Sequence, residues 1–169
     1  MKLAYEGKLP VVDTTAFVAP NATIIGDLEI GAQSSVWFGT VIRGDVMPIR
    51  IGKRTSIQDN SVVHATSGWT PTLVGDDCTV GHAVTLHGCR VADRVLVGMG
   101  SIVLDGAEIE SDTMIGAGSL VTPNIKIPSG VLAVGRPAKV VRPLTDEERK
   151  RILDSAAIYV HHTAIYLKG

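Results

Sequence analysis

The sequence predicts an all-β solenoid, a parallel β-helix of hexapeptide repeats followed by a C-terminal α-helix. Three observations predict it: aliphatic residues recur with a period of six, 18 glycines occur in 169 residues, and only 4% of the residues are aromatic. Many glycines in an apolar chain indicate short strands joined by tight corners. A sandwich of half-buried strands would instead show a period of two.

The period is carried by an aliphatic residue at the first position of each repeat, here numbered i. Of 20 such positions, 19 are Val, Ile or Leu. They are Val12, Val18, Ile24, Ile30, Val36, Ile42, Ile51, Ile57, Val63, Val74, Val80, Leu86, Val91, Val97, Val103, Ile109, Ile115, Val121 and Ile127, and Ala133 is the exception. Three strands close a triangle, and coils stacked at the ~4.8 Å spacing of neighbouring strands give an aliphatic column inside a prism.

Two further positions of the repeat predict how the chain turns the corners of the prism. Position i+4 is mostly small, as in Ala22, Ser34 and Thr40, which leaves room for a turn. At position i+1 we expect a backbone conformation that side chains resist. Glycine occupies that position at Gly31, Gly52, Gly75, Gly81, Gly98 and Gly116.

This pattern resembles the hexapeptide-repeat superfamily, whose fold is a left-handed parallel β-helix, over roughly residues 12 to 138. We assign residues 1–143 to that domain, including an N-terminal lead-in. The repeat gains three residues after Ile42, gains five after Val63 and loses one after Leu86. We expect loops there, the larger one spanning residues 65–73.

Residues 144–169 are expected to form a helix packed along the prism. Thr145-Asp146-Glu147-Glu148 is a capping-box signature that opens a helix running to about Leu167. Apolar residues recur at three- and four-residue steps and predict the packed face. They are Ile152, Leu153, Ala156, Ala157 and Val160. The adjacent His161 and His162 are read as solvated.

Composition limits the possible partners and the location. With 16 basic and 17 acidic residues, the net charge is −1, and no charge run could follow a phosphate backbone or an anionic membrane. We therefore expect no nucleic acid partner. Neither a signal peptide nor a membrane span is evident, so a soluble cytoplasmic protein is expected. Cys78 and Cys89 are expected to be free thiols near the core.

Three of the five histidines lie within 24 residues and have informative repeat phases. His64 and His87 both occupy position i+1 on the third face of consecutive coils, so they should stack. His82 occupies i+2 on the second face, around a corner, and cannot meet them within one chain. The cluster becomes complete if a threefold axis sets the second face of one subunit against the third face of the next.

Three imidazoles with an open fourth position are the ligand set of catalytic zinc, so the phases predict a metal site shared between the subunits of a homotrimer. Iron(II), cobalt and nickel also suit three histidines. By the same arithmetic, the contact that assembles the histidines brings Arg43 of one subunit to Asp59 of the next. We expect an intersubunit ion pair there, which holds the trimer and orients the site.

These residues carry a more specific resemblance. The stretches are Arg43-Gly44-Asp45, Gln58-Asp59-Asn60, the spacing H-x17-H-x4-H at His64, His82 and His87, Leu86-His87-Gly88-Cys89, Val97-Gly98-Met99-Gly100 and Gly135-Arg136-Pro137-Ala138. Together they resemble the γ-class carbonic anhydrases over most of the chain. The resemblance implies a homotrimer that hydrates carbon dioxide reversibly to bicarbonate, with a metal at each interface.

The resemblance also implies roles for individual residues. Gln58 would hydrogen-bond the reacting species at the metal. Arg43, fixed by Asp45 and Asp59, would shape the side from which the anion leaves. Val62 would contribute to an apolar surface for carbon dioxide.

One departure from the family pattern bears on the rate. Active members carry a glutamate in the loop after the first histidine that shuttles protons, whereas residues 65–73 contain no carboxylate. Tyr159 on the final helix could approach the metal or could simply pack. Two other functions stay open: a noncatalytic metal-binding scaffold, and a hexapeptide acyltransferase that uses one histidine as general base.

Overall fold

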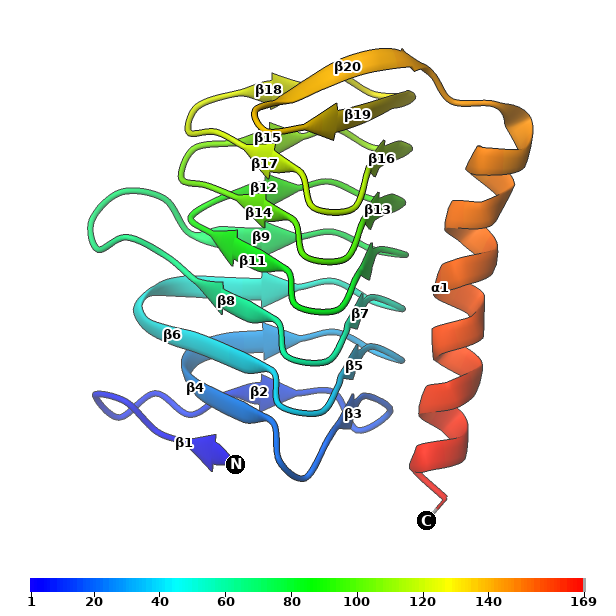
Figure 1. Ribbon diagram of the computed structural model, residues 1–169. Coiled ribbons are helices and arrows are strands. Elements are labelled where there is room, and N and C mark those ends of the chain that lie inside the picture. Colours follow the sequence, from blue (N-terminus) through cyan, green and yellow to red (C-terminus); the bar gives the residue numbers. More distant parts are fainter. Residues whose placement is uncertain (169) are drawn as a thin grey trace.

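The computed structural model describes residues 1–168 as a left-handed parallel β-helix of triangular section with one helix alongside it (Figure 1). The first face is a stack of β2 (Val11–Val12), β9 (Thr72–Val74), β12 (Arg90–Val91), β15 (Glu108–Ile109) and β18 (Lys126–Ile127). The second face holds β3 (Phe17–Val18), β5 (Ser35–Val36), β7 (Ser56–Ile57), β10 (Thr79–Val80), β13 (Val95–Val97), β16 (Thr113–Ile115) and β19 (Val131–Gly135).

The third face holds β1 (Lys2–Leu3), β8 (Val62–His64), β11 (Thr85–His87), β14 (Ile102–Val103) and β17 (Leu120–Val121). Two long strands, β4 (Thr23–Ile30) and β6 (Val41–Ile51), bend around the corner between the third and first faces. They therefore join these two faces into one 12-stranded sheet. The strand β20 (Ala138–Pro143) pairs antiparallel with β19 and covers the end of the prism (Figure 1).

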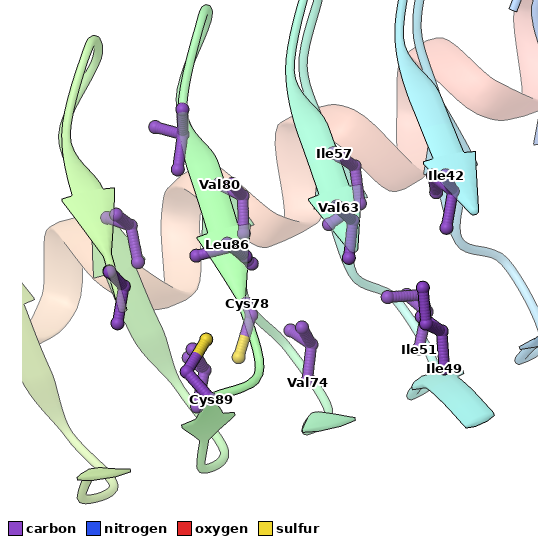
Figure 2. Packing of buried hydrophobic residues seen from close by; sticks show 14 of the residues in the cluster. Ile42, Ile49, Ile51, Ile57, Val63, Val74, Cys78, Val80, Leu86 and Cys89 are labelled. Carbon is purple, nitrogen blue, oxygen red and sulfur yellow. The ribbon is translucent and has the colours of Figure 1, made fainter. Parts of the chain in front are cut away.

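The pairing register confirms that equal repeat phases stack. Val80 pairs with Ile57 on the second face, and Leu86 pairs with Val63 on the third. These i residues are fully buried and fill the inside of the prism (Figure 2). Cys78 and Cys89 are buried among them as free thiols, as predicted, and burial raises the pKa of each thiol to about 12.

The corners correct one part of the sequence interpretation. None of the glycines at i+1 has a positive φ; instead, the left-handed conformation falls at i+3, in residues such as Arg54 (φ 52°) and Ala83 (φ 56°). Glycine at i+1 is required by close approach between coils. A Cβ on Gly31, for example, would lie 2.7 Å from the carbonyl carbon of Gly52 in the next coil.

The helix α1 (Asp146–Tyr166) lies along the second face (Figure 1). Thr145 caps it and Glu148 completes the capping box, as the sequence predicts. The expected packed face is confirmed in part: Ile152 and Ala156 are buried, together with Thr163, and Val160 is half-buried, whereas Leu153 and Ala157 are exposed. Adjacent helix residues are turned about 100° apart, so only one of each neighbouring pair can face the prism.

His161 and His162 are exposed on α1, as expected. Among residues 1–168, no helix combines the length and the apolar character needed to cross a membrane.

Candidate metal centre

His64 and His87 lie one above the other on the third face. They end β8 and β11, and the strand register pairs them directly. Their side chains are 17% and 28% exposed, and Nδ1 of His64 lies 3.2 Å from Nε2 of His87. The stacking that the repeat phases predict is thereby confirmed.

The separation of these two nitrogens suits coordination of one metal ion. Two nitrogens at about 2.0–2.1 Å from one tetrahedral zinc ion stand about 3.3 Å apart. The observed 3.2 Å matches this spacing. The spacing of the pair is therefore compatible with two ligands on one ion.

His82 lies elsewhere, just beyond β10 on the second face. Its side chain is 46% exposed, and its Nδ1 lies 2.8 Å from Oδ2 of Asp59 in the coil below. Across residues 1–168, no three His, Cys, Asp or Glu side chains converge on a common point that could hold a metal. A single chain therefore provides the two-histidine half of the predicted site on one face and the third histidine on another.

Each of the three histidines has a carboxylate partner. Nε2 of His64 lies 3.0 Å from Oδ1 of Asp45, and Nδ1 of His87 lies 2.9 Å from Oδ2 of Asp105. Together with the pair of His82 and Asp59, each ring has one nitrogen facing a carboxylate and the other left for a ligand. Imidazoles that bind metals in proteins are commonly held in this way.

Asp105 is the site residue that the sequence interpretation missed. Val103 pairs with Leu86, so Asp105 stands one coil above Gly88 and beside His87. The same face arithmetic that stacked the histidines could have found it. Burial works to raise the pKa of Asp105, but hydrogen bonding by His87, and to a lesser degree by Thr66, outweighs burial and holds the pKa below its ordinary value.

Arg43 and Asp45 lie next to the histidine pair. Arg43 donates to Asp45 Oδ2 at 2.5 Å, while the other oxygen of the same carboxylate faces His64. Asp59 lies around the corner on the second face, paired with His82, so the predicted contact of Arg43 with Asp59 is not made within one chain. Val62, also on the third face, is exposed.

Gln58 and Tyr159 share a cavity with His82. The cavity, of about 410 Å³, lies between the second face and α1. Tyr159 packs edge-on against Trp37 with ring centroids 5.6 Å apart, and burial, with a smaller effect of Asp59, raises the pKa of its hydroxyl. Tyr159 therefore both packs and reaches the space beside one of the three histidines.

The loop between β8 and β9 is held close to the histidine pair. Thr72 Oγ1 donates to the carbonyl oxygen of His64 at 2.5 Å, and the Thr70 hydroxyl donates to the carbonyl oxygen of Gly88. Trp69 is half exposed at the outer part of the loop. The loop thus borders the site while adding no carboxylate to it.

Comparisons with known proteins assign the chain to a family, although no protein-family model matches it. It is 50% identical over 157 residues to gamma carbonic anhydrase 1, mitochondrial, of Arabidopsis thaliana, a match that covers 90% of this chain and 57% of the plant protein. The chain thus spans less than two thirds of that relative's length.

A bacterial relative is matched over most of its own length. The carbonic anhydrase of Geobacillus kaustophilus is 49% identical over 162 residues, which is 96% of this chain and 88% of that protein. Among solved structures, a Bacillus cereus protein described as a putative acetyltransferase superposes with a TM-score of 0.96 at 48% identity, covering 98% of this chain and 95% of that one. On the identity and coverage of its relatives, the chain belongs to the gamma carbonic anhydrase family.

Proposed function

We propose that this protein catalyses metal-dependent, reversible hydration of carbon dioxide to bicarbonate at sites between the subunits of a homotrimer. The observation that carries the proposal is the facing nitrogen pair of His64 and His87, 3.2 Å apart, with His82 displaced to the neighbouring face. The names of the relatives support the same reaction. A cytoplasmic location stays a prediction.

The histidines are the residues that would hold the metal, two from one subunit and His82 from the next. A bound zinc ion would supply Lewis-acid activation of water near neutral pH. Cobalt, nickel and iron(II) suit the same nitrogen ligands. The chain's own contribution is to orient the imidazoles, which the carboxylates of Asp45, Asp59 and Asp105 do by occupying the remaining ring nitrogens.

Residues around the metal would bind the substrate and the product. Gln58 is buried beside His82 and can donate or accept a hydrogen bond at the reacting oxygen. Exposed Val62 gives apolar surface next to the histidine pair, where uncharged carbon dioxide would bind. Arg43 pairs with Asp45, which contacts His64, so it offers positive charge beside that pair and would favour bicarbonate on its way out.

Proton removal is where this chain departs from the pattern of its family. The loop at 65–73 has no carboxylate, so protons would leave through water and buffer. Tyr159 reaches the cavity beside His82, but its raised pKa makes it a poor proton acceptor near neutral pH. We therefore expect proton transfer to limit the rate.

The direct test is stopped-flow hydration of carbon dioxide by the protein after reconstitution with zinc, cobalt or, under anaerobic conditions, iron(II). The wild type should be active with at least one metal, and His64→Ala, His82→Ala and His87→Ala should each lose both metal and activity. His161→Ala, which removes an exposed histidine from α1, is the matched control and should lose neither. Absence of hydration with every metal would refute the proposal.

Two alternatives each rest on a specific observation. The loop without a carboxylate favours a noncatalytic metal-binding scaffold, which would bind metal at the three histidines yet hydrate no carbon dioxide. The Bacillus cereus structure, described as a putative acetyltransferase, favours acyl transfer. That chemistry needs one histidine as base rather than three, so stoichiometric metal after gentle purification would argue against it.

A further inference from the structure

We infer that Asp105 is a positioning residue: its carboxylate fixes the His87 ring in the Nδ1–H tautomer, so that the bare Nε2 faces Nδ1 of His64. The inference rests on the proposed metal site and specifies how Asp105 prepares one of its ligands. Asp105 touches neither the proposed metal nor the substrate, and it acts through His87.

The tautomer follows from the hydrogen-bond partners. An ionised carboxylate has no proton to donate, so the 2.9 Å contact between Asp105 Oδ2 and His87 Nδ1 requires the proton to be on Nδ1. A neutral imidazole carries one such proton, which leaves Nε2 with an exposed lone pair. That nitrogen is the one 3.2 Å from His64.

His64 is set in the complementary way. Its Nε2 lies 3.0 Å from Asp45 Oδ1, which places its proton on Nε2 and leaves Nδ1 bare. Two carboxylates thus turn two lone pairs toward each other at the spacing of ligands on one ion. Facing lone pairs repel unless a cation or a proton lies between them, so this arrangement is organised in advance for a cation.

The surroundings of Asp105 argue against a purely structural role. Its side chain is 13% exposed, its Oδ1 is shielded from solvent, and nothing in residues 1–168 forms a hydrogen bond to that oxygen. A buried acceptor without a partner costs free energy of folding. Among the described residues, His87 is the main hydrogen-bond partner of the Asp105 carboxylate, and Thr66 contributes more weakly.

Space for this carboxylate depends on Gly88, the residue after His87. Gly88 has φ 55°, and a Cβ added there would collide with Asp105 Oδ1. Asp45 and Asp59 differ from Asp105 in their partners and in their exposure. Asp45 also binds Arg43, and Asp59 and its histidine are both well exposed, at 32% and 46%. Asp105 is therefore a buried carboxylate whose main partner is one histidine.

The first test observes the tautomer in the wild-type protein and uses a variant only to assign the signals. In metal-free wild-type protein with ¹⁵N-labelled histidine, long-range ¹H–¹⁵N spectra should show His87 protonated at Nδ1, with its signals assigned by their loss in His87→Gln. A wild-type His87 whose Nδ1 carries no proton would overturn the inference, whatever the metal affinity. Because this spectrum is recorded without metal, it is independent of whether the protein hydrates carbon dioxide.

The second test measures affinity for Zn²⁺ and Co²⁺ by competition with a chelator. Asp105→Asn should weaken both by about 10- to 100-fold and change the visible absorption spectrum of bound Co²⁺. Asp112→Asn is the matched control, because Asp112 pairs with Arg94 away from the histidines, and it should leave the metal affinity unchanged. An Asp105→Asn protein that keeps wild-type affinity and spectrum would also overturn the inference, whereas a wild type that binds neither ion would instead refute the proposed function.

Discussion

We propose that each site takes His64 and His87 from one subunit and His82 from its neighbour. A His82→Ala chain then lacks the ligand on its second face, whereas a His87→Ala chain lacks one of the two ligands on its third face. Each variant alone should bind little metal, because every interface has lost one of three ligands. In a trimer refolded from an equal mixture, an interface is intact when a His82→Ala chain supplies the third face and a His87→Ala chain supplies the second. Random assembly makes that true at about one quarter of the interfaces.

The assay is metal per subunit, by elemental analysis of the trimer fraction from gel filtration. We expect about 25% of the wild-type content in the mixture and close to none in either variant alone. Mixing His64→Ala with His87→Ala is the control, because these two side chains face each other within one chain and no mixed trimer can reunite them. Restoration in this control, or none in the first mixture, would refute a site shared between subunits.

Four further predictions follow from particular contacts. Gly98→Ala should lower the free energy of unfolding by about 3 kcal/mol, because its Cβ would collide with the backbone of the next coil. Gly118→Ala should lower it by only about 1 kcal/mol, because the space there is open and only the φ of 68° opposes a side chain. Equal losses in denaturant titrations would contradict this. Carbon dioxide hydration should rise with imidazole buffer at fixed pH, and Ser67→Glu should raise the low-buffer rate, by up to about 10²-fold; a rate indifferent to both would point to another proton acceptor. Arg43→Ala should raise the protein concentration at which sedimentation detects dissociation of the trimer. An unchanged concentration would exclude the predicted ion pair with Asp59 from the interface. Hydrogen bonds from Arg142 and Thr145 lower the pKa of Glu148 to about 2. The contribution of Glu148 to stability is therefore present above its ordinary pKa of 4.5 and is lost as the pH falls towards 2. Acid titration by circular dichroism should show this loss in the wild type and not in Glu148→Gln.

The repeat makes much of this protein readable from its sequence. In a solenoid, a residue's place is set by its phase and its coil, so counting from Val12 put His64 beneath His87 and put His82 on another face, and the strand register agrees. The capping box at Thr145 is likewise a local pattern, and α1 begins where it predicts. Such features depend on short stretches of chain, or on a repeat that occurs many times along the sequence.

Other features required the three-dimensional arrangement. The i+1 glycines are explained by contact between coils, because what a Cβ on Gly98 would meet is the backbone around Ala117, in the next coil. On α1, the choice of Ile152 over Leu153 as the buried residue depends on how the helix is rotated against the second face. No local pattern encodes that rotation.

The pairing of Asp105 with His87 shows the same division within the site. Phase arithmetic brings the two residues to adjacent coils, but the hydrogen bond depends on the rotamers of both side chains and on the space left by Gly88. The sequence by itself determined which residues stack, because a period of six fixes their order along the prism. Only the tertiary structure decided which atoms meet, because side-chain torsions and the approach of neighbouring coils are set by packing and not by the period.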